Sequence, residues 1–187
     1  SIFVNRTGFP SEEEYAHYPR DLTKDIDLLC QENVDYVFAP PEDEMFPPGF
    51  GTFVQVEECE EKLSGLSRDV MFRINPTSTL KLIQIIRPTS FFLGQKDAIQ
   101  GAVLRKMIRD LHLNTEVVLV PVLRGTSGLA YGVRNQYLRE NERAAATVVY
   151  KSLQAASGMI MAGESQTRKI LGGIAEVIEA EPLARLQ

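Results

Sequence analysis

The stretch FFLGQKDAIQ, residues 91–100, decides the fold because it joins two periodicities. The apolar run 90–93 ends at Gly94, and a helical pattern over 97–112 follows at once. Beyond that helix, TEVVLVPVL (115–123) is a continuous apolar run, which is typical of a strand inside a parallel sheet. The sequence therefore predicts a strand–helix–strand unit with a polar turn at the carboxyl end of its first strand.

A second unit of the same kind opens the chain. Residues 1–5 and 34–39 are apolar runs that predict strands, and a helical pattern over 21–32 lies between them. Two such units predict an α/β fold with a doubly wound parallel sheet. The remaining expected elements are a candidate edge strand at 52–58, a helix from Pro76 that Pro88 closes, and helices at 140–157 and 165–180.

The composition argues against several classes of function. A net charge of −5 over 187 residues is unsuited to binding a nucleic-acid backbone, and no apolar run approaches the ~18 residues of a membrane span. The cysteines and histidines share no metal-ligand spacing; they are Cys30, Cys59, His17 and His112. We therefore expect no nucleic-acid partner, no membrane span and no metal held by the protein.

Three loops leave the carboxyl ends of predicted strands, where open parallel sheets bind ligands. They are residues 5–9, 94–97 and 124–135. In the second loop, Lys96 offers a positive charge to phosphate oxygens, and Asp97 offers a carboxylate to ribose hydroxyls. The amides at the start of helix 97–112 face the same place. The alternative is that Gly94 only ends the strand, Lys96 is solvated and Asp97 caps the helix.

The arginines of the other loops leave the same choice open. Arg124 and Arg134 flank a glycine-rich segment and are suited to clamp an anion, or they are solvated residues of a flexible connector. Arg68 and Arg73 serve a carboxylate substrate or lie on a loop surface.

Taken together, these stretches resemble the pantothenate synthetase (pantoate–β-alanine ligase) family, collinearly from Ser1 to about Leu183. The anchors are SIFVN, YPRDL, VDYVFAP, MFPPGF, KLIQIIRP, FLGQKD, RKMIRDL, VPVLR, GLA and RNQYL followed by ER. The resemblance implies a Rossmann-like sheet of the nucleotidyltransferase type over 1–122, incomplete at its N-terminus. Part of a small C-terminal lid domain is then expected over 123–187.

The resemblance also implies a reaction. The family joins the pantoate carboxylate to AMP from ATP and releases pyrophosphate, with Mg²⁺ shielding the phosphates. The amine of β-alanine then attacks the pantoyl adenylate. Such chemistry depends mainly on positioning and charge neutralisation. A cytoplasmic homodimer of the coenzyme A pathway is implied as well.

The family roles fall on seven residues of this chain. Lys96 and Arg134 are the implied catalytic and phosphate-binding cations. Gly94 and Asp97 match positions around the ribose. Asn5, Arg68 and Gln100 match substrate-binding positions, with Gln100 as an amide that holds pantoate.

Several pocket positions depart from the family pattern. In NPxQF the proline is Arg6 and the glutamine, an amide that would hold pantoate, is Gly8. RPGHFxGV reads RDVMFRIN over 68–75, with Met71 in place of histidine. The serine pair of the REPDGLAMSSRN loop is Gly132-Val133, and the first glutamine of KDxQQ is Ile99.

The family's HxGH turn for ATP and most of its C-terminal domain have no counterpart in this sequence, and we expect both ends to be cuts through something larger. We therefore expect an incomplete or impaired family member. The alternatives are a catalytically silent scaffold of the same fold and an adenylate-forming enzyme for another carboxylate.

Overall fold

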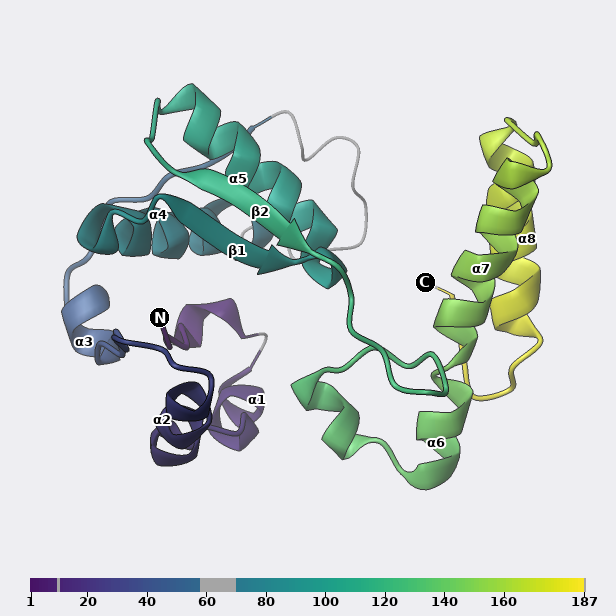
Figure 1. Cartoon of the computed structure of the whole chain (residues 1–187), viewed down its shortest axis with the longest axis horizontal. Helices are drawn as coiled ribbons and strands as arrows, with labels where there is room; N and C mark the ends of the chain where they lie inside the picture. Colours follow the sequence, from purple (N-terminus) through teal and green to yellow (C-terminus); the bar gives the residue numbers. More distant parts are fainter. Residues whose placement is uncertain (10, 58–69, 187) are drawn as a thin grey trace. The chain divides into compact units, whose positions relative to one another are not determined.

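The structure, a computed structural model, describes residues 1–9, 11–57 and 70–186. These residues form two compact units, Ser1–Val120 and Pro121–Gln187 (Figure 1). The functional division predicted from the sequence, with a nucleotide-binding domain over 1–122 and a lid over 123–187, stays a prediction.

The first unit is built on the predicted strand–helix–strand element. Strand β1 (Ser90–Gly94) pairs in parallel with β2 (Glu116–Val120), and the register runs from Ser90 opposite Glu116 to Gly94 opposite Val120. Helix α5 (Ala98–Asp110) connects the two strands. The α/β class and the parallel pairing are confirmed. Figure 1 shows α5 lying along the β1–β2 pair.

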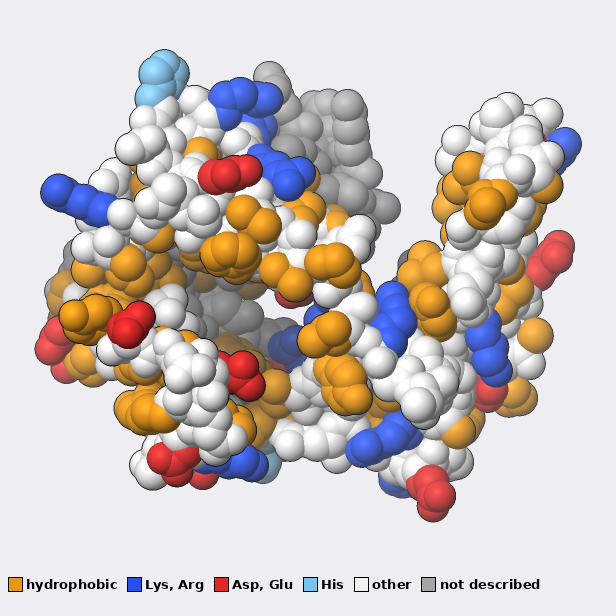
Figure 2. Space-filling model, viewed as in Figure 1, with side chains coloured by type: hydrophobic (Ala, Val, Ile, Leu, Met, Phe, Trp, Pro, Cys, Tyr) orange, Lys and Arg blue, Asp and Glu red, His pale blue; other side chains and the backbone are white. Residues whose placement is uncertain are grey.

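The core of this unit lies between α5, the sheet and the segment before α4 (Asn75–Ile86). Val103, Leu104 and Met107 of α5 are almost completely buried, and Val117 of β2 and Phe72 pack in the same cluster. Each such side chain contributes about 1.5–3 kcal/mol of transfer free energy. The other face of the sheet is open, since Phe92 is 66% exposed, and hydrophobic side chains appear over β1 and β2 in Figure 2.

Local signals explain where the helices stop. Helix α5 ends at Asp110, and His112 just beyond it has a left-handed φ of 53°. The Leu113 N–H then closes the turn on Ile108 O at 2.9 Å. Helix α4 ends in a similar way at Ile86, and its C-cap residue Arg87 has a left-handed φ of 52°, just before the predicted stop at Pro88.

The strands predicted at 1–5 and 34–39 are wrong. Among the described residues, one backbone hydrogen bond, from Ile2 N–H to Phe38 O at 2.9 Å, joins the two segments, and a β-ladder needs a repeating series. The candidate edge strand at 52–58 is wrong over its described residues, 52–57. The Val54 N–H donates to the Thr77 hydroxyl at 2.9 Å and the Val56 N–H to Phe72 O at 3.0 Å, so this segment bonds to a helical one.

Short helical elements surround these extended segments. They are η1 (Arg6–Gly8), α1 (Glu12–His17), α2 (Leu22–Gln31), α3 (Glu42–Met45) and the π-helical turn η3 (Val70–Ile74) that leads into α4. Helix α2 confirms the helix predicted at 21–32, and Asp21 caps it by accepting the Lys24 N–H at 3.0 Å.

The second unit is helical. It contains η5 (Val133–Tyr137), α6 (Glu140–Ala145), α7 (Val148–Met161) and α8 (Thr167–Glu179), and α7 packs on α8. The single helix predicted at 140–157 is wrong, because the chain breaks at Thr147, whose hydroxyl donates to Ala144 O at 2.8 Å. In the described part of the chain, no helix is long and apolar enough to cross a membrane.

We predict that Gly101→Val destabilises the first unit. Gly101 is the point of closest approach between α5 and the sheet, because a Cβ there would lie 2.8 Å from Leu119 Cδ2 and 3.5 Å from Leu93 Cδ2. Overpacking of this kind costs about 1–3 kcal/mol. Urea unfolding followed by far-ultraviolet circular dichroism measures the loss.

The matched control is Gly172→Val in α8, where a Cβ meets no described atom within 4 Å. The control should change the unfolding free energy by less than about 0.5 kcal/mol. Equal losses of unfolding free energy in the two variants would contradict the close approach of α5 to the sheet at Gly101.

Candidate functional site

Asn5 joins the first loop to the start of α4. Its Oδ1 accepts hydrogen bonds from the Thr7 N–H at 3.0 Å and the Thr7 hydroxyl at 2.7 Å. Its Nδ2 donates to the Ser78 hydroxyl at 2.8 Å, and that hydroxyl donates to Ile74 O at 2.9 Å. Most of the hydrogen-bonding capacity of this predicted substrate residue therefore holds the loop in place.

Arg6 is fixed by an acidic and aromatic cluster. Its backbone N–H donates to Glu42 Oε1 at 3.2 Å, and the Tyr15 hydroxyl donates to Glu42 Oε2 at 3.1 Å. Its guanidinium pairs with Glu12 at 2.6 Å, and the hydrogen bond from Arg6 holds the pKa of the Glu12 carboxyl below its usual value. A proline at this position would have no N–H for Glu42.

The turn that follows β1 carries four of the predicted site residues. Gly94 is the last residue of β1, and Lys96 and Asp97 are exposed on η4 (Gln95–Asp97). Gln100 is half-buried in the first turn of α5. These residues lie at the carboxyl end of the sheet, the edge at which parallel sheets bind ligands.

Two details of this turn favour a ligand. Asp97 occupies the N-cap position of α5, but its side chain makes no capping hydrogen bond. The alternative that Asp97 serves to cap the helix with its side chain is therefore wrong. A Cβ at Gly94 would meet no described atom within 4 Å, and its φ of −66° does not require glycine. The backbone of Gly94 thus borders open space beside a cation, a carboxylate and the first amides of a helix.

The other predicted site residues lie elsewhere. Arg134 is exposed on η5 in the second unit, and Arg68 lies outside the described residues. Arg73 stacks over the Phe53 ring at 3.9 Å from its centroid, which gives this arginine a packing role. The convergence of Arg134, Arg68 and the β1 turn on one ligand stays a prediction.

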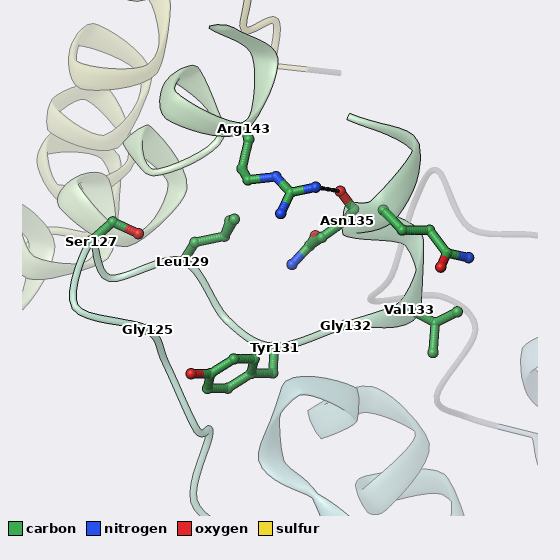
Figure 3. A pocket seen from close by; sticks show the side chains of 9 residues that line it. Gly125, Ser127, Leu129, Tyr131, Gly132, Val133, Asn135 and Arg143 are labelled. Atoms are coloured by element: carbon green, nitrogen blue, oxygen red, sulfur yellow. Dashed lines mark hydrogen bonds between the residues drawn. The ribbon is translucent and has the colours of Figure 1, made fainter. Parts of the chain in front are cut away.

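The glycine-rich loop of the second unit encloses a pocket of about 400 Å³. Figure 3 shows the Arg143 side chain extending to Asn135, whose backbone oxygen accepts from Arg143 Nη2 at 2.9 Å. The Asn135 Nδ2 donates in turn to Ala130 O at 2.7 Å. Gly132 and Val133 line the same pocket and carry no polar side chain.

Arg124 contacts both this loop and Tyr150 of α7. Its guanidinium lies 4.2 Å from the Tyr150 ring centroid, and its Nη1 donates to Gly128 O at 3.2 Å. These contacts use one of the five N–H donors of the guanidinium, so the anion-binding hypothesis for Arg124 stays a prediction. Gly128 has a φ of +87° and packs against the same ring.

Sequence reasoning missed two residues that hold the loop of the second unit, Arg143 and Asn135. The only sequence signal for Arg143 was its place in the ER pair that follows RNQYL. The hydrogen bond from Arg143 to Asn135 crosses the turn between η5 and α6. Helical periodicity in the sequence does not predict such a contact.

Comparison with known proteins decides the family. The family model described as pantoate-beta-alanine ligase matches residues 1–187, the whole sequence.

The chain belongs to the pantoate-beta-alanine ligase family.

Relatives and solved structures agree with the family model. Pantothenate synthetases from Chloroflexus aurantiacus and Carboxydothermus hydrogenoformans are each 46% identical to the chain, over 99% and 100% of it. The chain spans 66% of the length of both relatives.

Two solved structures resemble this chain in their fold. The pantothenate synthetase of Thermus thermophilus superposes with a TM-score of 0.90 at 38% identity, covering 97% of this chain and 66% of that one. The Francisella tularensis ligase, complexed with beta-gamma ATP and beta-alanine, gives a TM-score of 0.75 at 30% identity, covering 95% of this chain and 66% of that one.

We predict that Gly128→Ala loosens the loop of this ligase-family chain. A Cβ there would lie 2.4 Å from Tyr150 Cδ1, and the positive φ adds backbone strain. The two effects together should cost about 2–4 kcal/mol. Thermal unfolding monitored by circular dichroism, with limited proteolysis of the loop, measures the loss.

Gly163→Ala separates the two effects. Gly163 has a φ of +94° but no described atom within 4 Å of a built Cβ, so it reports strain alone, about 1 kcal/mol. If Gly128→Ala proves no worse than Gly163→Ala, the Tyr150 contact does not hold the loop.

Proposed function

We propose that this chain is the part of a pantothenate synthetase that binds ATP and pantoate, with turnover impaired by its altered pocket. The reaction is the ATP-dependent condensation of pantoate with β-alanine through a pantoyl adenylate. The observation that carries the proposal is the turn after β1 in a chain of this family. There Gly94, Lys96 and Asp97 lie at the carboxyl end of the sheet, and the Asp97 carboxylate makes no capping bond.

The proposed roles follow from charge and position. Lys96 neutralises phosphate oxygens, helped by the first amides of α5, and Asp97 accepts the ribose hydroxyls. The open space at Gly94 admits the nucleotide close to the backbone. Magnesium enters with ATP, since Mg²⁺ is commonly bound through substrate phosphates and keeps several waters.

The substrate side of the proposal uses amides and arginines. Gln100 holds pantoate from the first turn of α5, and Asn5 shapes the neighbouring loop. By resemblance to the family, Arg134 is assigned to the phosphates and Arg68 to the substrate. Positioning of the pantoate carboxylate beside the α-phosphate then supplies most of the rate that remains.

One observation favours the silent alternative. Met71 stands where the family pattern has histidine, and it packs against the hydrophobic core of the first unit. Gly132 and Val133 also lack the hydroxyls of the serine pair. A chain that binds the nucleotide without releasing pyrophosphate would be such a scaffold.

We predict that Lys96→Ala and Asp97→Asn weaken MgATP binding without changing the fold. Loss of one charged contact costs about 1–3 kcal/mol, which is roughly 5- to 150-fold in Kd. With one main cation, the unmodified chain should have a Kd on the order of millimolar. Gly94→Ala should weaken binding while leaving stability unchanged, because its Cβ meets only open space. Titration calorimetry with MgATP measures the affinities.

Lys24→Ala, an equal change of charge on the exposed face of α2, is the control and should have no effect. A parallel assay for pyrophosphate release with pantoate separates the alternatives. Release indicates a working ligase, and binding without release indicates the silent scaffold. Unchanged MgATP affinity in all three variants would overturn the assignment of this turn.

Homodimerisation and a cytoplasmic location belong to the same proposal and are supported by family membership alone. Multi-angle light scattering of the chain should give the mass of two chains, about 42 kDa from a chain mass of 20.9 kDa (2 × 20.9). A mass of one chain at high concentration would refute the dimer.

A further inference from the structure

Helix α5 meets the sheet at a glycine in its first turn. Gly101 is buried, and the side chains that cover it come from both strands: Leu93 of β1 and Leu119 of β2, which lie opposite each other in the register. A Cβ built on Gly101 would lie 2.8 Å from Leu119 Cδ2 and 3.5 Å from Leu93 Cδ2. Carbon atoms pack at about 3.5–4.0 Å. Any other residue at this position would therefore require Leu119 or the helix to move.

This contact lies directly behind the candidate nucleotide turn. Leu93 precedes Gly94 in β1, and Gly101 lies one helical turn beyond Asp97. Neither Gly94, at the start of η4, nor Asp97, at the start of α5, makes a capping hydrogen bond with its side chain. Side-chain caps therefore do not fix where the turn lies, and the depth at which α5 packs on the sheet becomes a main constraint on it.

Glycine is otherwise a poor choice for this position. It is among the weakest helix formers, and it brings no side chain to the core, whereas Val103, Leu104 and Met107 of the same helix are almost completely buried. Its φ is not in the left-handed region, so the backbone does not require glycine. What Gly101 contributes is the close approach of the first turn of α5 to the sheet.

We propose that Gly101 is a positioning residue for the nucleotide site. The close approach places the amides of the first turn of α5, and the Asp97 carboxylate at its start, beside Gly94. Gly101 does not contact the ligand and acts only through the position of the helix. This role rests on the proposed function, because it requires a nucleotide at the turn after β1.

Gly101→Ala in the full chain tests this role. Alanine should be tolerated by the fold, because it is the better helix former and the first atom it meets is the end of a leucine side chain. The Kd for MgATP should rise about tenfold, because the first turn of α5 moves away from Gly94. Protein-observed NMR titration measures this Kd at millimolar and weaker affinities, and urea unfolding of the same samples should change little.

Leu119→Val separates positioning from stability. Valine lacks both Cδ atoms, so that Leu93 Cδ2, at an ordinary contact distance of 3.5 Å, is the one that remains of the three atoms nearest to a Cβ at position 101. Leu119→Val alone should lower stability and leave the Kd for MgATP within about threefold of the original. Added to Gly101→Ala, it should restore that Kd to the same range. A merely structural role would give the opposite result, with the weakest binding in the least stable chain, the double variant.

Gly172→Ala is the matched control. It makes the same substitution in α8, where a Cβ meets no described atom within 4 Å, and should leave the Kd for MgATP unchanged. An unchanged Kd in Gly101→Ala, or a loss that Leu119→Val fails to restore, would overturn the role of Gly101 while leaving the proposed function in place. An original chain that does not bind MgATP would overturn the proposed function and this role with it.

Discussion

The parallel pairing of β1 with β2 is the constraint on which the rest of the first unit depends. Because the pairing is parallel, the chain must return along the sheet between the two strands, and α5 makes that return. Gly101 lets the helix approach the sheet closely, and Val103, Leu104 and Met107 then bury their side chains. The same geometry sets the turn Gly94–Asp97 at one edge of the sheet, beside the start of the helix. The position of the candidate nucleotide site is thus a consequence of how the core is formed.

The first loop shows how an altered sequence keeps its local structure. Arg6 replaces a proline of the family pattern and so adds a backbone donor, which Glu42 accepts. Glu42 also accepts the Tyr15 hydroxyl, while Asn5 ties the loop to Ser78. The loop is therefore stabilised by several polar contacts that do not require Gln at position 8.

Local patterns predicted local elements well. Apolar periodicity, with stops such as Pro88, predicted five elements: β1, α5, β2, α2 and α4. The structure confirms them. The strands expected at 1–5 and 34–39 failed because an apolar run does not specify a hydrogen-bonding partner, and the pair shares one bond. The single helix expected at 140–157 failed because the Thr147 hydroxyl competes with a helix that periodicity favours. At the site, spacing marked Lys96 and Asp97, but the hydrogen bond from Arg143 to Asn135 depends on the turn between η5 and α6. No pattern along the chain contains that contact.

The departures from the family pattern divide into two physical kinds. Met71 and Arg6 are absorbed by the fold, one by the hydrophobic core and the other by Glu42, and neither needs a ligand. Gly8 is different, since the nearest described atom to a Cβ built there, Asn75 Oδ1, lies 4.0 Å away, and a larger side chain at this position would meet no close atom at its Cβ. The first kind of departure is compatible with an enzyme or a scaffold. Ligand affinities, rather than the fold, therefore decide between the two.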